Sequence, residues 1–212
     1  GLFDDVDIAM LTHTGADSFG TFGIHGSSNG MIGKTIQYIG KASHAGGSPH
    51  LGVNALNSAL LGLSGIHAQR DTFRDSDTVR VHPIITKGGA SVNSVPSDVH
   101  LETYVRASNI PAILSTAEKI DRALRAGALA TGAQVRIITN PGYLPTKYDR
   151  ALTEIYRHNA ASLVGDDNVI PRNHGTGCSD IGDVSHIIPT IQPTVNAATG
   201  EGHGVDYVVT NY

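Results

Sequence analysis

The residues best suited to chemistry are histidines in loops rich in small residues. The chain has eleven histidines, and neutral imidazole is a common ligand of zinc and other divalent metals. His13 follows an apolar segment at residues 6–11, and His203 lies in Gly-Glu-Gly-His-Gly. Two imidazoles cannot complete a tetrahedral zinc site, and a separation of 190 residues is no motif. From position alone, a histidine capping a strand end and an unrelated loop histidine are the simpler interpretation.

A second pair of histidines lies in the glycine-rich stretch 40–52, between a predicted strand and a predicted helix. Loops of this kind commonly present binding or catalytic side chains on a rigid scaffold. His44, flanked by Ser43 and Ala45, fits either such a role or a packed position. We interpret His50 as a packing or loop residue.

Two polar residues frame a predicted strand at 98–106. Asn93 lies in Gly-Gly-Ala-Ser-Val-Asn-Ser-Val-Pro, a pattern typical of an ordinary hairpin with a left-handed asparagine. Arg106 ends the strand. A guanidinium binds carboxylates through two parallel hydrogen bonds, so Arg106 suits carboxylate recognition, although a solvated strand end also explains it.

A polar loop at 175–183 contains Asp180 and the single cysteine, Cys178. A carboxylate at such a site can orient a metal-bound histidine by accepting its second ring N–H. We interpret Cys178 as a packed small residue because no obvious base accompanies it.

The middle of the chain alternates between strand and helix patterns. Residues on one face of 98–106 are apolar or threonine, and those on the other are polar. Asn109 is a predicted N-cap, and Gly132 a predicted helix end. The predicted elements are strand 31–39, loop 40–52, helix 53–69, strand 78–85, strand 98–106, helix 110–131 and strand 134–139. This βαββαβ order predicts a ferredoxin-like sandwich, whose sheet edge is a weak physical reason to expect a dimer.

The flanking segments predict a second unit. We expect a buried strand at 6–11 that ends in the loop of His13, a connector at 17–30, a helix from about 150 to 165, and a short strand at 187–191. The predicted domains are residues 1–30, 31–144 and 145–212, with the middle one inserted between two parts of another domain.

Composition limits the class of partner and the compartment. A net charge of −4 and a pI of about 6.2 give no reason to expect nucleic acid or an anionic membrane surface. A single cysteine fits a reducing compartment, and we expect the cytoplasm. The chain starts without methionine and without a turn or cap, as a piece of a longer protein would.

Four segments together resemble the M20 metallopeptidases and amidohydrolases, in particular the amidohydrolase branch that includes the aminobenzoyl-glutamate hydrolases. They are Leu-Phe-Asp-Asp-Val-Asp followed by a histidine, small-His-Ala with Ser-Pro-His-Leu-Gly-x-Asn-Ala-Leu, Gly-Gly-x-x-x-Asn-x-x-Pro followed by an arginine, and Gly-Cys-Ser-Asp-Ile-Gly-Asp-Val-Ser. Thr14 replaces the usual proline, and Cys178 replaces a small hydroxyl residue.

The resemblance implies a role for each candidate residue. His13 and His203 would be ligands of a site for two divalent ions, zinc or manganese. His44 would reach the partner subunit's active site and stabilise the oxyanion. Asn93 and Arg106 would bind substrate, and Asp180 would orient a metal-bound histidine. That family's other ligands and its general base lie before the segment at 2–7, so the metal site is incomplete here, and we expect this piece alone to be inactive.

The implied fold is α/β, with a ferredoxin-like lid (dimerisation) domain inserted in an incomplete zinc-peptidase-like catalytic domain. The implied function is metal-dependent hydrolysis of amide bonds in N-acyl or N-aminoacyl amino acids, such as aminobenzoyl-glutamate-like compounds or dipeptides, by a homodimer. Two alternatives stay open: a catalytically inert dimerisation fragment, and a ferredoxin-like module that binds a small ligand.

Overall fold

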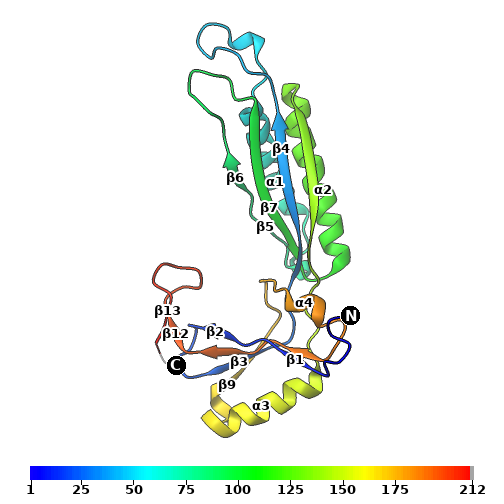
Figure 1. The fold of residues 1–212 in the computed structure, drawn as a ribbon, viewed down its shortest axis with the longest axis vertical. Helices are drawn as coiled ribbons and strands as arrows, with labels where there is room; N and C mark the ends of the chain where they lie inside the picture. Colours follow the sequence, from blue (N-terminus) through cyan, green and yellow to red (C-terminus); the bar gives the residue numbers. More distant parts are fainter. Residues whose placement is uncertain (211–212) are drawn as a thin grey trace. The chain divides into compact units, whose positions relative to one another are not determined.

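The computed structural model describes residues 1–210, apart from the side chain of His25. Two compact units are present (Figure 1). One, the insert, is residues 31–142, and the other, the flanking unit, combines residues 1–30 with the chain from 143 onward. The assignment of these units as lid and catalytic halves stays a prediction. Within the described residues, no helix has the length and apolarity needed to cross a bilayer.

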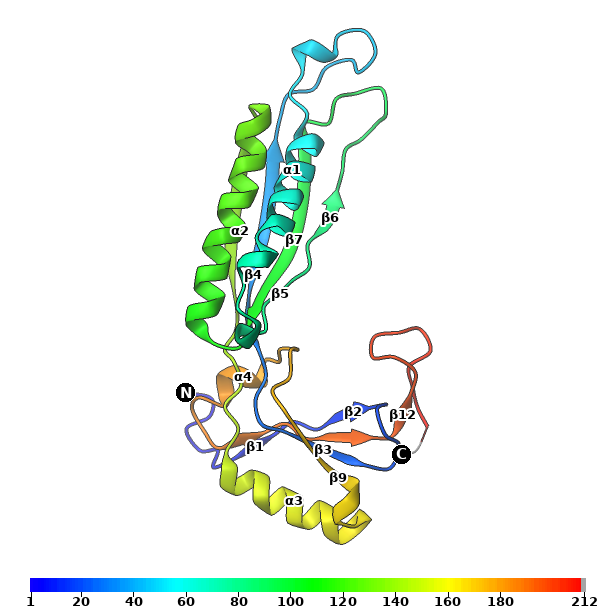
Figure 2. The ribbon, with the colours of Figure 1, turned by 180° about the vertical axis from the view of Figure 1, so that it is seen from behind.

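The insert has the βαββαβ order predicted from the sequence, except that the second strand is divided into β5 and β6. Its sheet has the order β5-β7-β4-β8, with β6 also pairing with β7. Helices α1 and α2 pack on each other and on one face of the sheet, which Figure 2 shows from the helix side. The elements are β4 (Gly30–Ile39), α1 (Ala55–Ala68), β5 (Arg80–Val81), β6 (Ile84–Lys87), β7 (Asp98–Ala107), α2 (Ile110–Thr131) and β8 (Gln134–Tyr143), with 3₁₀ turns at Pro49–Leu51, Arg70–Thr72 and Asp75–Asp77.

The core of the insert lies between this sheet and the helices. It contains the fully buried side chains of Ile36, Tyr38, Leu101 and Leu124. The helices approach closely because glycine lies at the contact: a Cβ on Gly127 would lie 2.3 Å from a backbone oxygen of α1. Small residues at a helix contact thus set the spacing of the helical layer.

The local signals in the insert predicted its helix ends well. Asn109, the predicted N-cap, accepts a backbone N–H group in the first turn of α2, and Asn54, which was not predicted, caps α1 in the same way. Gly132 ends α2 with φ 75°, in the left-handed region that favours glycine. The alternation on β7 is confirmed, since Val99, Leu101, Thr103 and Val105 are buried.

One predicted strand of the insert was wrong. Residues 78–85 do not form a single strand: β5 and β6 are separated by His82 and Pro83, and a register shift follows in β6. Proline has no N–H to donate to the neighbouring strand, so the ladder breaks there.

The flanking unit contains a four-stranded sheet of order β2-β11-β3-β9, with β2 and β11 parallel. Helix α3 packs near β3 and β9, where the rings of Phe22 and Tyr156 lie 6.3 Å apart. The elements are β1 (Ala9–Met10), β2 (His13–Gly15), β3 (Phe22–His25), α3 (Arg150–Val164), a 3₁₀ turn (Asp166–Asn168), β9 (Val169–Arg172), α4 (Ile181–Val184), β10 (Thr190–Ile191), β11 (Thr194–Asn196), β12 (Ala198–Thr199) and β13 (Val208–Val209).

Several predictions for the flanking unit need correction. Residues 6–11 are not a buried strand: only β1 pairs, with β10, and Ile8 and Met10 are more than half exposed. The strand expected at 187–191 is reduced to β10. His13 begins strand β2 instead of lying in a loop, and the expected connector at 17–30 contains β3. These strands have two to four residues, too few for an alternation pattern to stand out.

Candidate functional site

A cavity of about 890 Å³ in the flanking unit is lined by both His13 and His203. His13 is the first residue of β2, and His203 lies in the loop between β12 and β13. The same cavity is lined by the carboxylate residues Asp17 and Glu201 and by Arg172. Residues from opposite ends of the chain therefore meet at one polar cavity.

The imidazole of His13 is held by an amide. Nε2 of Gln192 lies 3.2 Å from Nε2 of His13. An amide N–H can only donate, so this ring nitrogen accepts and the neutral ring carries its proton on Nδ1. Gln192 is in turn fixed by the hydroxyl of Tyr148, 2.9 Å from its Oε1, and by Ser179 Oγ at 3.1 Å.

The backbone of His203 has an uncommon conformation. Its φ is 65°, in the left-handed region that a non-glycine residue rarely adopts. The N–H of Gly204 donates to the carbonyl of Glu201 at 2.7 Å, which closes the turn. A hydroxyl contact of 2.8 Å between Tyr207 and Thr14 ties the following segment to β2. A non-glycine residue in the left-handed region at the wall of a polar cavity is often found at functional sites.

Arg172 and Asp17 form an ion pair at this cavity, with 2.5 Å between Nη2 and Oδ2. Neither residue was singled out from the sequence. For Arg172 the reason is that β9, the strand that it ends, has no recognisable strand pattern. The pair places one cationic and one anionic side chain at the wall of the cavity.

Of the two candidates in the loop 175–183, Cys178 lies near His13. Cys178 lines a smaller cavity of about 170 Å³ together with His13 and Gln192. Asp180 is exposed at the start of α4, and its Oδ1 lies 3.4 Å from Ser179 Oγ. Within residues 1–210 the structure shows no hydrogen bond from a ring N–H of His13 to Asp180, so the orienting role of Asp180 stays a prediction.

In the insert, the ring of His44 is oriented by its own loop. Its Nδ1 accepts the backbone N–H groups of Gly46 and Gly47 at 3.1 and 2.9 Å. The proton of the neutral ring is therefore on Nε2, and the side chain is exposed. His44 thus presents a hydrogen-bond donor away from its own loop, which is what stabilisation of an oxyanion requires.

The loop of His44 is joined to the loop of Asn93. The N–H of Ala45 donates to the carbonyl of Asn93 at 2.9 Å, and the N–H of Val95 donates to the carbonyl of Ser43 at 3.0 Å. The two loops form a short antiparallel pair between His44 and Ser94. The structure therefore brings together two of the predicted site residues of the insert.

Arg106 lies at the other end of β7 from Asn93. Asn93 precedes the strand, which starts at Asp98, and Arg106 is its ninth residue. At ~3.3 Å per residue, the ends of this strand segment are roughly 26 Å apart. The guanidinium lies over the ring of Tyr104, 5.3 Å from the centroid. Asn93 and Arg106 of one copy cannot contact the same small molecule.

Comparison with known proteins shows the family. The model of the peptidase dimerisation domain of the M20 family matches residues 26–131. The chain belongs to the M20 peptidase family. The matched region covers most of the insert, residues 31–131 of 31–142.

Curated relatives of this M20 chain are hydrolases by name. It is 31% identical over 198 residues to Xaa-Arg dipeptidase of Mus musculus, covering 91% of this chain and 44% of that protein. It is 31% identical over 136 residues to a p-aminobenzoyl-glutamate hydrolase subunit of Escherichia coli, covering 64% and 27%. The chain thus spans less than half the length of these relatives.

Solved structures have the same fold. An aminobenzoyl-glutamate utilization protein from Klebsiella pneumoniae matches with a TM-score of 0.71 and 21% identity over 92% of this chain and 51% of that one. An amidase of the hydantoinase/carbamoylase family from Burkholderia vietnamiensis matches with a TM-score of 0.78 and 17% identity over 96% and 50%. At these identities the likeness concerns the fold alone.

Potential metal ligands of this M20 chain are not clustered in the described residues. Among residues 1–210 no three or more His, Cys, Asp or Glu side chains are grouped to hold a metal ion. His13 and His203 face one cavity, but they supply only two imidazoles. This donor set fits part of a metal site and is too small to be a whole one.

Proposed function

We propose that this M20 chain belongs to a metal-dependent hydrolase of amide bonds in N-acyl or N-aminoacyl amino acids, with aminobenzoyl-glutamate-like compounds or dipeptides as substrates. The observation that carries the proposal is the shared cavity of His13 and His203. The names of the curated relatives, a dipeptidase and an aminobenzoyl-glutamate hydrolase, support the same reaction class.

His13 and His203 would each hold a divalent ion, zinc or manganese, and further ligands would come from residues outside this chain. When bound, such ions lower the pKa of water toward ~7 and polarise the amide carbonyl. The lone pair of His13 Nε2 accepts from Gln192, so metal binding at this nitrogen requires the amide to move. Asp180 would then orient a metal-bound histidine.

The insert would complete the site of a second copy. The Nε2–H of His44 would donate to the oxyanion that forms when hydroxide attacks the amide carbonyl. Asn93 would bind the substrate from the same loop pair. Arg106 lies at the other end of β7 and would bind the carboxylate of a substrate. The Asn93 and the Arg106 of one copy would therefore serve two different active sites. This division requires a homodimer, which we place in the cytoplasm because the chain has a single cysteine.

Substrate hydrolysis by the complete protein that contains this chain tests the proposal. We expect cleavage of p-aminobenzoyl-glutamate or of dipeptides, lost on chelation and restored by zinc or manganese. His13→Ala and His203→Ala should each abolish it, and His50→Ala, at an exposed loop histidine, is the matched control. If His13→Ala and His203→Ala both hydrolysed substrate at the wild-type rate, the proposed metal site would be wrong.

One observation favours a second function, that of an inert dimerisation fragment. No group of three or more potential ligands is present in the described residues. Calorimetry of residues 1–212 with zinc tests whether this chain alone binds metal or is an inert fragment. Tight binding of two ions would contradict the inert interpretation, and the absence of binding would support it without bearing on the complete protein.

A further inference from the structure

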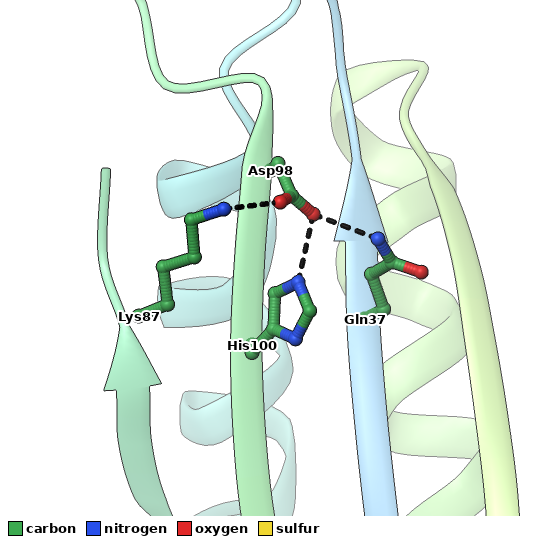
Figure 3. Close-up of polar contacts among 4 residues, drawn as sticks. All are labelled: Gln37, Lys87, Asp98 and His100. Atoms are coloured by element: carbon green, nitrogen blue, oxygen red, sulfur yellow. Dashed lines mark hydrogen bonds and ion pairs between the residues drawn. The ribbon is translucent and has the colours of Figure 1, made fainter. Parts of the chain in front are cut away.

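The carboxylate of Asp98 joins three strands of the insert (Figure 3). Its Oδ1 accepts from Nε2 of Gln37 at 2.7 Å and from Nε2 of His100 at 2.9 Å, and its Oδ2 accepts from Nζ of Lys87 at 2.5 Å. Gln37 belongs to β4, Lys87 ends β6, and Asp98 and His100 begin β7. The group is fully engaged although its side chain is 37% exposed.

The positions of these partners along the chain connect the cluster to the loops. Lys87 and Asp98 are the residues on either side of the loop 88–97, so their ion pair closes the stem of the loop that carries Asn93. Gln37 lies near the end of β4, which leads into the loop of His44. Beside it, the N–H of Gly40 donates to the carbonyl of Ser97 at 2.8 Å. One carboxylate therefore holds the stems of both loops.

Backbone hydrogen bonds also hold the stems, such as the one from the N–H of Ala55 to the carbonyl of Pro96 at 2.8 Å, and the carboxylate of Asp98 adds side-chain contacts to them. Loop 88–97 begins with two glycines, and Gly89 has φ 144°. A cavity of about 170 Å³ lies between the Lys87–Asp98 pair and residues 94–96. Since the two loops are bonded to each other through Ala45 and Val95, a shift at the stem would move them as one body.

We propose that Asp98 is a positioning residue that fixes the joined loops of His44 and Asn93 by clamping their stems. The catalytic part of this inference rests on the proposed function, whereas the clamp itself does not. Exposed ion pairs contribute little to folding stability, so loss of the clamp should move the loops without unfolding the insert. The hydrogen bond from Gln37 and those from Lys87 and His100 hold the pKa of Asp98 well below its usual range, which keeps the carboxylate charged.

Hydrogen exchange of residues 1–212 tests the clamp directly. In Asp98→Ala we expect the amides of Gly40, Ala45 and Val95 to exchange about tenfold faster, because their bonds open more often. Glu102→Ala is the matched control, since Glu102 is exposed on the same strand and its carboxylate forms no hydrogen bond or ion pair within residues 1–210. Lys87→Met should also speed the exchange of these amides. Lys87→Arg, which keeps the positive charge, should exchange at about the wild-type rate. Unchanged exchange in both Asp98→Ala and Lys87→Met would overturn the inference.

Turnover by the complete protein tests the consequence. Asp98→Ala should lower kcat by about tenfold, because the oxyanion that His44 stabilises forms only at the transition state, and should also raise KM, because Asn93 moves with the same loops. Faster exchange with wild-type kcat would overturn the positioning role. If the wild-type protein hydrolyses no amide substrate, the proposed function fails, and the exchange experiment still decides whether the clamp exists.

Discussion

The two groups of candidate site residues are held by different means. His13 and His203 line a cavity: Gln192 holds the ring of His13, and the backbone of His203 is in the left-handed region. His44 and Asn93 lie on exposed loops joined by backbone hydrogen bonds. Side-chain contacts can yield to an incoming ligand, whereas backbone contacts keep a donor in a fixed orientation. The first group suits ligand exchange, and the second suits preorganised hydrogen bonding.

Loss of a cavity histidine should have the largest effect. In the complete protein, His203→Ala should reduce kcat/KM by about 10³-fold or more, because it removes several kcal/mol of metal-dependent stabilisation of the transition state. Steady-state kinetics with added zinc or manganese measure this effect. A reduction of kcat/KM by less than about tenfold would contradict the assignment of His203 to the metal site and of His44 and Asn93 to hydrogen bonding.

Loss of the loop histidine should rank second. His44→Ala should lower kcat by about 10²–10³-fold with little change in KM, since it removes one oxyanion donor. Metal content, measured by elemental analysis, should stay at the wild-type value in this variant and fall in His203→Ala. Equal metal loss in both variants would contradict the separation of roles.

Packing between the helices of the insert should affect stability and not chemistry. Gly127→Ala places a Cβ 2.3 Å from the carbonyl oxygen of Ser58, and overpacking of this kind costs about 1–3 kcal/mol. Denaturant unfolding of residues 1–212 measures the cost, and Ala126→Ser, at the adjacent exposed position of α2, is the control. Equal midpoints for the two variants would mean that the helices are not in close contact there.

The smallest effect concerns a histidine of the flanking unit outside the cavity. The ring of His174 bonds to Ser27 Oγ and Asn29 Oδ1, both at 2.8 Å, and burial lowers its pKa. Because the unfolded chain binds this proton more readily, stability is fully present above the unfolded pKa of about 6.5 and falls as the pH decreases through that value. Unfolding curves at about pH 7.5 and about pH 5.5, on either side of that pKa, should show this loss, and it should be smaller in His174→Gln. An unchanged pH dependence in the variant would contradict the assignment.

The predictability of the two units from sequence also differs. The insert has long elements with local signals: alternation along β7, asparagine N-caps, and Gly132 at a helix end. The flanking unit is built from strands of two to four residues whose partners lie far along the chain, such as β2 with β11. Periodicity needs more residues than these strands have, so β3 and β9 could not be recognised.

The site was predictable only through its resemblance to the M20 family. Nothing in the spacing of His13 and His203 indicates that they share a cavity, because they are 190 positions apart and only tertiary structure brings them together. The backbone bonds that join the loops of His44 and Asn93 leave no side-chain pattern. The contacts of Gln192, Arg172 and Asp98 depend equally on tertiary structure.

Complementation between variants tests most directly whether each site combines a cavity from one copy with loops from another. His44→Ala and His203→Ala are mixed as inactive dimers of the complete protein, dissociated and reassociated. If His44 serves its partner's cavity, the mixed dimer contains one intact site, and activity should return to about a quarter of the wild-type value on random pairing. If activity stays at the level of the separate variants while mixed dimers form, His44 does not act across the dimer and the account is contradicted.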